Sequence, residues 1–177
     1  TERVALLAEA LCAFTGGDSK LARRAAELSK SDLVSDMVGE FADLQGTMGR
    51  YYALHDGEDL RVAEALFEQY LPRFAGDDLP ITTTGITLAL ADRLDSLVGI
   101  FSIGQQPSGS RDPFALRRAS LGVLRIIVDR QVDIDLELAI SVAAKPFGGE
   151  AGELKVQVLT YIIERFKSWY RDEGMAA

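Results

Sequence analysis

Two aspartates that lie three residues apart are the first candidates for chemistry. Asp92 and Asp95 stand in the stretch ALADRLDSL, whose apolar spacing predicts a helix. Side chains three apart share a helix face, so the two carboxylates could form a metal site or its outer shell. Carboxylates without histidines are weak ligands for transition metals, however. We therefore favour an ion pair with an arginine, for which the candidate partners are Arg93, Arg117 and Arg118.

The remaining nucleophiles and metal ligands are scarce. The chain has one histidine, His55, in a turn beside Asp56, which is typical of a solvated surface histidine. Its one cysteine, Cys12, lies on the apolar face of a predicted helix and is expected to be a small buried hydrophobe. The segment GQQPSGSRD, residues 104–112, lacks the lysine and the preceding strand of a phosphate-binding loop. These residues assemble neither a nucleophile–base pair nor a structural zinc site.

Charge is distributed unevenly along the chain. The net charge is −8. Residues 1–95 hold 9 Lys/Arg against 17 Asp/Glu, whereas residues 96–177 hold 10 of each. An acidic surface repels phosphate and disfavours nonspecific nucleic-acid binding. Five arginines nevertheless cluster in one stretch that has only two aspartates: Arg111, Arg117, Arg118, Arg125 and Arg130. An RNA contact is one interpretation, but by themselves these residues favour a solvated, salt-bridged helix face.

Helical periodicity dominates the chain and predicts an all-α fold. We expect helices over residues 2–14, 32–53, 58–71, 84–103, 113–130, 134–144 and 150–173, and a further helix after residue 18 that carries Leu21, Ala25 and Leu28. Asp18 or Ser19 should cap the second helix, and Asp112 with Pro113 should open the helix that carries the arginines. Glycines at 39, 46 and 49 make a single unbroken helix over residues 32–53 doubtful.

Length and composition are those of an ordinary globular protein. The chain has 177 residues, of which 47% are apolar and 26% charged, which fits one domain. No apolar run approaches the about 18–20 residues that span a bilayer. A single cysteine suits a reducing compartment, so we expect a cytoplasmic location. The first residue is Thr1 rather than Met, and we expect a piece of a longer chain.

Two long blocks of sequence resemble a known family. The blocks are KSDLVSDMVGEFADLQGTMGRYYA (residues 30–53) and ALADRLDSLVGIFSIGQQPSGSRDPFALRRASLGVLRI (residues 89–126). Both resemble the β subunit of bacterial tetrameric glycyl-tRNA synthetase, as do residues 68–80 and 164–174. The resemblance covers most of the chain. It departs from the family pattern at three positions: Ala42, Gln69 and Ser108.

The resemblance implies a fold related to HD-domain phosphohydrolases, a single helical bundle over residues 1–177. Its long terminal helix, residues 150–177, would lead toward a following domain. The motif ADRL around Asp92 resembles the last metal-binding aspartate of HD enzymes. Ser29 and Lys30 stand where an active HD site would have histidine and aspartate. The resemblance therefore implies neither a metal nor a catalytic residue in this chain.

The same resemblance implies a role in ATP-dependent glycyl-tRNA aminoacylation. The chain would be a non-catalytic domain that supports tRNA binding and assembly and holds no cofactor, because ATP and glycine belong to the α subunit. Its implied partners are the α subunit, the remaining β-subunit domains and tRNA(Gly), with no membrane. Two alternatives remain open: an HD-class metal-dependent phosphohydrolase, and an architectural spacer without RNA contact.

An RNA contact, if present, should come from the loop and helix between residues 105 and 125. Glycine and serines at 108–110 would let phosphate approach the backbone, and Arg111, Arg118 and Arg125 would supply charge. Arg118 and Arg125 are seven residues apart and share a helix face, whereas Arg117 points about 100° away. We therefore expect Arg117 to pair with Asp92 or Asp95.

Overall fold

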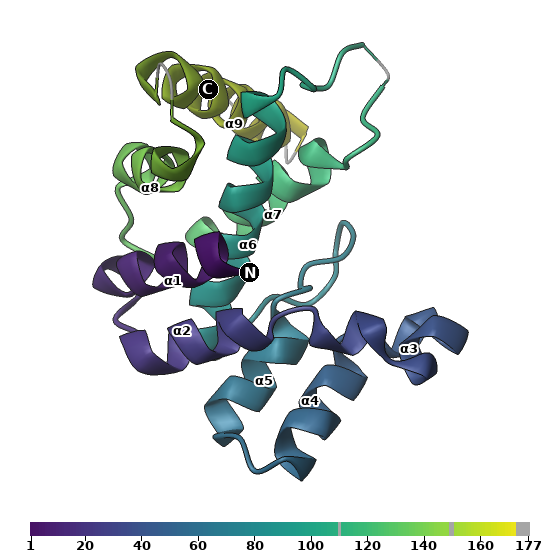
Figure 1. The fold of residues 1–177 in the computed structure, drawn as a ribbon. Helices are drawn as coiled ribbons and strands as arrows, with labels where there is room; N and C mark the ends of the chain where they lie inside the picture. Colours follow the sequence, from purple (N-terminus) through teal and green to yellow (C-terminus); the bar gives the residue numbers. More distant parts are fainter. Residues whose placement is uncertain (110, 149–150, 173–177) are drawn as a thin grey trace. The chain divides into compact units, whose positions relative to one another are not determined.

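The fold is all-helical, as the periodicity predicts. The structure, a computed structural model, describes residues 1–109, 111–148 and 151–172. Over these ranges it contains nine α-helices and three short 3-10 helices, with no β-strand (Figure 1). The chain divides into two compact units, residues 1–92 and 93–177. The single HD-like domain over residues 1–177 stays a prediction.

The first unit is built from helix pairs around a small-residue core. Its elements are α1 (Glu2–Thr15), α2 (Ser19–Leu28), η1 (Ser31–Val34), α3 (Asp36–Glu40), η2 (Ala42–Leu44), α4 (Thr47–His55), α5 (Leu60–Glu68) and the first half of α6 (Thr83–Ser102). Helix α2 packs on both α1 and α5, and α5 packs on α4 (Figure 1). Leu66 is buried between Ala53 and Ala63, with Leu28 packed against them. Small residues at these contacts let the helices approach closely.

Helix ends follow the local chemistry of the sequence. The Asp18 carboxylate accepts hydrogen bonds from the backbone N–H groups of Lys20 and Leu21, which confirms the predicted cap of α2. The α5 helix begins at Leu60, two residues later than predicted, because Asp59 caps it by accepting from Arg61 N. Cys12 is buried, as expected from its helix face.

The prediction of one helix over residues 32–53 is wrong. The segment forms three short elements, η1, α3 and η2, before α4 begins at Thr47. Ser35 is extended and caps α3 by accepting from Val38 N. Gly46 has φ +80°, a conformation that a helix does not contain and that glycine adopts without strain. These two residues break the helical run that the apolar spacing predicted.

Helix α6 begins on a buried carboxylate. The Glu68 side chain accepts from the backbone N–H groups of Ile81 and Thr82 and from the Thr82 hydroxyl. A Cβ at Gly85 would lie 1.8 Å from Glu68 Oε2, so a larger residue at this turn of α6 would have to displace the Glu68 carboxylate. The carboxylate satisfies N–H groups that a helix start otherwise leaves without partners.

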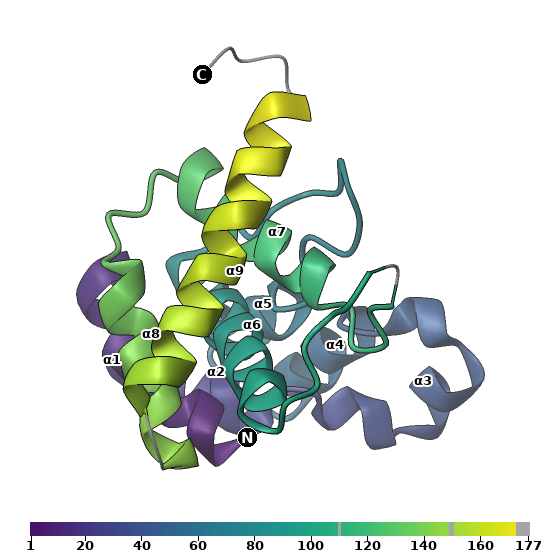
Figure 2. The same cartoon turned by 90° about the horizontal axis from the view of Figure 1, so that it is seen from above.

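The second unit centres on the long helix α9. Its elements are the second half of α6, α7 (Leu116–Asp129), α8 (Leu136–Ala144), η3 (Lys145–Phe147) and α9 (Ala151–Asp172). Helix α9 packs against α7 and α8 and buries Val158 and Ile162 (Figure 2). The Phe101 and Tyr161 rings lie 5.2 Å apart. The predicted limits of α9 at residues 150 and 173 lie outside the described residues.

Helix α7 starts three residues later than the prediction from Asp112-Pro113. The Asp112 carboxylate accepts from Leu116 N and Arg117 N. Asp112 is not the N-cap residue that we expected, however, and Pro113 is not in the first turn, because Ala115 is the residue that precedes the helix. Residues 113 and 114 form a non-helical turn before α7, and Ala115 has φ +54°. Of the helices described, none is long and apolar enough to cross a membrane.

Candidate functional site

Asp92 forms an ion pair with Lys30, a partner that the sequence did not suggest. The Lys30 ammonium contacts Asp92 Oδ1, and the two side chains are 41% and 18% exposed. Lys30 has φ +62° and follows the residue that ends α2. The pair therefore joins the end of α2 to α6 within the first unit. The predicted pairing of Asp92 with Arg117, which belongs to the second unit, stays a prediction.

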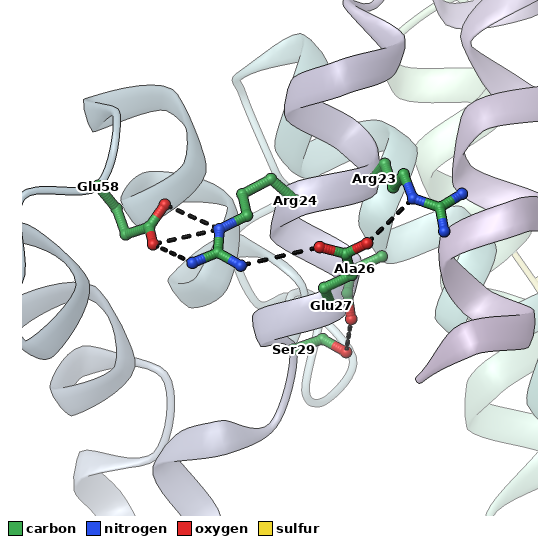
Figure 3. Close-up of polar contacts among 6 residues, drawn as sticks. All are labelled: Arg23, Arg24, Ala26, Glu27, Ser29 and Glu58. Atoms are coloured by element: carbon green, nitrogen blue, oxygen red, sulfur yellow. Dashed lines mark hydrogen bonds and ion pairs between the residues drawn. The ribbon is translucent and has the colours of Figure 1, made fainter.

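Ser29, the neighbour of Lys30, forms a side-chain hydrogen bond to the backbone of α2. It is buried, and its hydroxyl donates to the carbonyl of Ala26 at 2.7 Å, which closes the last turn of α2 (Figure 3). Ser29 and Lys30 stand where the resemblance puts the histidine and aspartate of an HD metal site. Here a hydroxyl bonded to the backbone and an ammonium group replace those two ligands.

A second carboxylate, Asp32, is buried next to this pair, and the sequence analysis missed it. Asp32 is 3% exposed and accepts from Gly46 N at 2.6 Å and from the Tyr70 hydroxyl at 3.0 Å. Burial raises the pKa of Tyr70 well above its usual range, and the charges of Asp32 and Asp92 raise it further. Tyr70 is therefore a neutral hydrogen-bond donor here rather than a base.

These residues do not fit a metal ion. A divalent cation at Asp92 would have to displace the Lys30 ammonium, which already balances the carboxylate charge. Asp32 is engaged by two donors, and His55 is 87% exposed at a turn beside Asp56. In the part of the chain that the structure describes, His, Cys, Asp and Glu side chains do not gather in threes at metal-binding spacing. The donor set thus favours a structural ion pair over metal-assisted hydrolysis.

Much of the positive charge on α2 is neutralised. Arg24 donates to both carboxylate oxygens of Glu58 and also lies 3.8 Å from Glu27 (Figure 3). Arg23 contacts Glu27 at 3.0 Å and Glu9 at 2.7 Å. The hydrogen bonds from Arg24 lower the pKa of Glu58. These arginines stabilise helix contacts of the first unit and offer little charge to a phosphate backbone.

The loop before α7 is fastened by an arginine from that helix. The Arg117 guanidinium donates to the carbonyl of Gly109. On the same loop Ser108 and Arg111 exchange two backbone hydrogen bonds of 3.1 and 2.9 Å, and Gly109 has φ +52°. Arg117 thus positions the loop that carries Arg111. Ser110, the third residue that we expected to admit phosphate, lies outside the described residues.

The three arginines expected to contact phosphate differ in exposure. Arg111 and Arg118 are exposed, one on the loop and one in the first turn of α7. Arg125 is 20% exposed, with its Nε 3.9 Å from Asp129 Oδ2. Arg93 is buried against α7, where a Cβ at Gly122 would lie 2.6 Å from its Nε. Of the three, Arg111 and Arg118 are therefore the better placed for an anion.

Together the fold and these side chains define an all-helical region whose buried acids serve ion pairs and helix caps. Comparison with known proteins identifies the family. The sequence profile of the family described as glycyl-tRNA synthetase beta subunit matches residues 1–177. The chain therefore belongs to the glycyl-tRNA synthetase beta subunit family.

Individual relatives carry the same name. The glycine–tRNA ligase beta subunit of Chromohalobacter salexigens is 53% identical over 177 residues, which covers 99% of this chain and 26% of the relative. The subunits of Pseudomonas putida and Marinobacter nauticus are each 54% identical over 176 residues, covering 26% and 25% of their lengths. The chain thus spans about a quarter of the length of these relatives.

Proposed function

We propose that residues 1–177 are a non-catalytic region of a glycyl-tRNA synthetase β subunit that helps to hold tRNA(Gly) during ATP-dependent aminoacylation. The observation that carries the proposal is the Arg117–Gly109 contact, which fixes a loop bearing exposed Arg111 at the start of α7, beside exposed Arg118. A loop whose backbone is already ordered loses less conformational entropy when the guanidinium group that it carries binds phosphate.

The chemistry of aminoacylation is assigned to other parts of the enzyme. In this proposal ATP and glycine bind to the α subunit, this region holds no cofactor, and the complex works in the cytoplasm. The α subunit and the remaining β-subunit domains are its protein partners. The Lys30–Asp92 pair disfavours the competing function, HD-class phosphohydrolysis, because it occupies a carboxylate that the metal would need.

The test uses the complete α/β enzyme with Arg111→Ala and Arg118→Ala combined. Each phosphate contact removed should reduce the salt dependence of tRNA binding by about one unit of slope. We expect the KM for tRNA to rise roughly tenfold, equivalent to about 1.4 kcal/mol. Glycine activation, measured without tRNA, should stay unchanged.

A matched control separates a local contact from a general charge effect. Lys20→Ala with Arg61→Ala removes the same charge from exposed positions of the first unit. This control should leave the tRNA kinetics unchanged. If the Arg111 and Arg118 variant also leaves them unchanged, the RNA role is wrong and the architectural spacer is the better description.

A further inference from the structure

Large apolar side chains are exposed on one short segment of the first unit. Residues 31–44, which form η1, α3 and η2, carry four of them: Leu33, Val34, Met37 and Phe41. Val34 is 89% exposed. Single exposed apolar residues are ordinary on a protein surface, but four within fourteen residues give one short segment an amount of exposed apolar surface that is typical of a contact with another surface. We name these four side chains the 31–44 face.

The segment is held in place by buried groups rather than by the 31–44 face. Asp32 anchors it through Gly46 N and the Tyr70 hydroxyl, and the Val38 side chain of α3 is buried. Ser35 links the two anchors because its hydroxyl donates to Asp32 O and accepts from Val38 N. The backbone is therefore fixed while the apolar side chains remain in solvent. Figures 1 and 2 both show α3 at the end of this unit away from α1.

The charged residues around the 31–44 face indicate which kind of surface could bind it. Residues 31–44 contain four acidic residues and no lysine or arginine. Of the four, Asp36, Glu40 and Asp43 are exposed. This segment repels a phosphate backbone, which excludes RNA as its occupant. A matching surface has apolar side chains at its centre and lysines or arginines around them.

We propose that the 31–44 face docks on such an apolar, basic-rimmed surface in the remainder of the β-subunit polypeptide. This inference rests on the proposed function, which places the chain inside that subunit. The chain spans about a quarter of its relatives, so most of each relative lies outside the matched region. Four partly exposed side chains offer much less than the about 800 Å² per partner that separately diffusing proteins bury. A small face suffices when both surfaces belong to one chain, because the link keeps their effective concentration high.

The test is a photo-cross-link in the full-length β subunit. Met37 is replaced by p-benzoylphenylalanine, the protein is irradiated with and without the α subunit, and cross-linked peptides are mapped by mass spectrometry. The matched control places the same group at Leu60, which is exposed on α5 outside the segment. We expect position 37 to cross-link to β-subunit residues beyond this 177-residue region, with a yield at least tenfold above the control. The α subunit should not change the yield.

Charge reversal supplies a second readout that does not depend on the probe. Asp36→Lys with Glu40→Lys should reduce the cross-link severalfold, whereas Asp56→Lys, on an exposed turn of the same unit, should not. Cross-links to the α subunit or to tRNA, or a yield no higher than the control, would overturn the docking proposal. A β subunit that fails this test yet loses tRNA affinity when Arg111 and Arg118 are neutralised retains the proposed function. If the cross-link forms but the Arg111 and Arg118 variant has normal tRNA kinetics, the docking proposal stands and the tRNA-binding role fails.

Discussion

Replacing Asp32 by alanine should lower the free energy of unfolding by about 3 kcal/mol. A hydrogen bond to a charged group contributes about 1.5–3 kcal/mol, and the Asp32 carboxylate accepts two. Alanine leaves the buried Gly46 N–H without its acceptor. The Tyr70 hydroxyl loses less, because it also interacts with Gln45. For a chain of this length the change corresponds to a melting temperature lower by roughly 6–12 °C.

A double-mutant cycle with Tyr70→Phe isolates one of the two hydrogen bonds. Phenylalanine keeps the ring and removes only the hydroxyl that donates to Asp32 at 3.0 Å. In the background of Asp32→Ala the loss of that hydroxyl should cost less, which gives a coupling energy of about 1–2 kcal/mol. The measurement is urea unfolding of the four proteins, followed by circular dichroism. Asp36→Ala, on the exposed side of the same segment, should stay within about 0.5 kcal/mol of the parent. Additive losses for Asp32→Ala and Tyr70→Phe, or a change at Asp32 as small as at Asp36, would refute the buried anchor.

Three further predictions test other contacts. Gly85→Ala should destabilise the chain by about 1–3 kcal/mol because the new Cβ would meet Glu68. Gly39→Ala, where the Cβ would have open space, should not destabilise it. Thermal unfolding of the two variants measures the difference. Hydrogen bonds from Arg73 lower the pKa of Asp77 to about 2, so this carboxylate stabilises the fold above about pH 4 and the contribution is lost as the pH falls toward 2. Because Arg73 is half exposed, Asp77→Asn should remove only about 1 kcal/mol of that acid-dependent stability. If the parent and the Asp77→Asn variant lost stability equally in acid, the Arg73–Asp77 pair would not form in solution. Lys30→Met should lower the free energy of unfolding by about 1 kcal/mol, measured by urea unfolding. Elemental analysis of the parent protein should find no stoichiometric metal. If metal were found, and were lost together with a phosphatase activity in Asp92→Ala, the phosphohydrolase function would be supported instead.

Local chemistry explains the parts of the fold that the sequence predicts. Asp18 caps α2 through N–H groups two and three residues away, so its role depends on its immediate neighbours alone. Asp112 also accepts from N–H groups at the start of α7, but these belong to Leu116 and Arg117, four and five residues away. The helix therefore starts later than the prediction, because the left-handed Ala115 before Leu116 is not visible from capping preferences. The glycines of residues 32–53 indicated that a helix over this segment would be interrupted. They did not indicate that Gly46 would adopt a positive φ and bind Asp32.

Long-range partners explain what the sequence could not predict. Lys30 and Asp92 are 62 positions apart, and Asp32 and Tyr70 are 38 apart. No periodicity relates such pairs, because their contact depends on how α2, α5 and α6 pack. Arginines are candidate partners for Asp92 by residue type, and the structure adds Lys30 as a partner from the same unit. A residue type thus indicated that Asp92 would be paired, but only the packing determined with which side chain.

Hydrogen exchange of the complete α/β enzyme, with and without tRNA(Gly), tests the proposed RNA contact most directly. The backbone amides of the loop before α7 and of its first turn, which carry Arg111 and Arg118, should exchange at least tenfold more slowly when tRNA is bound. Amides of residues 31–44, where the acidic segment repels phosphate, should not change. Unchanged exchange at the loop in an enzyme saturated with tRNA, or protection of the acidic segment instead, would contradict the proposal.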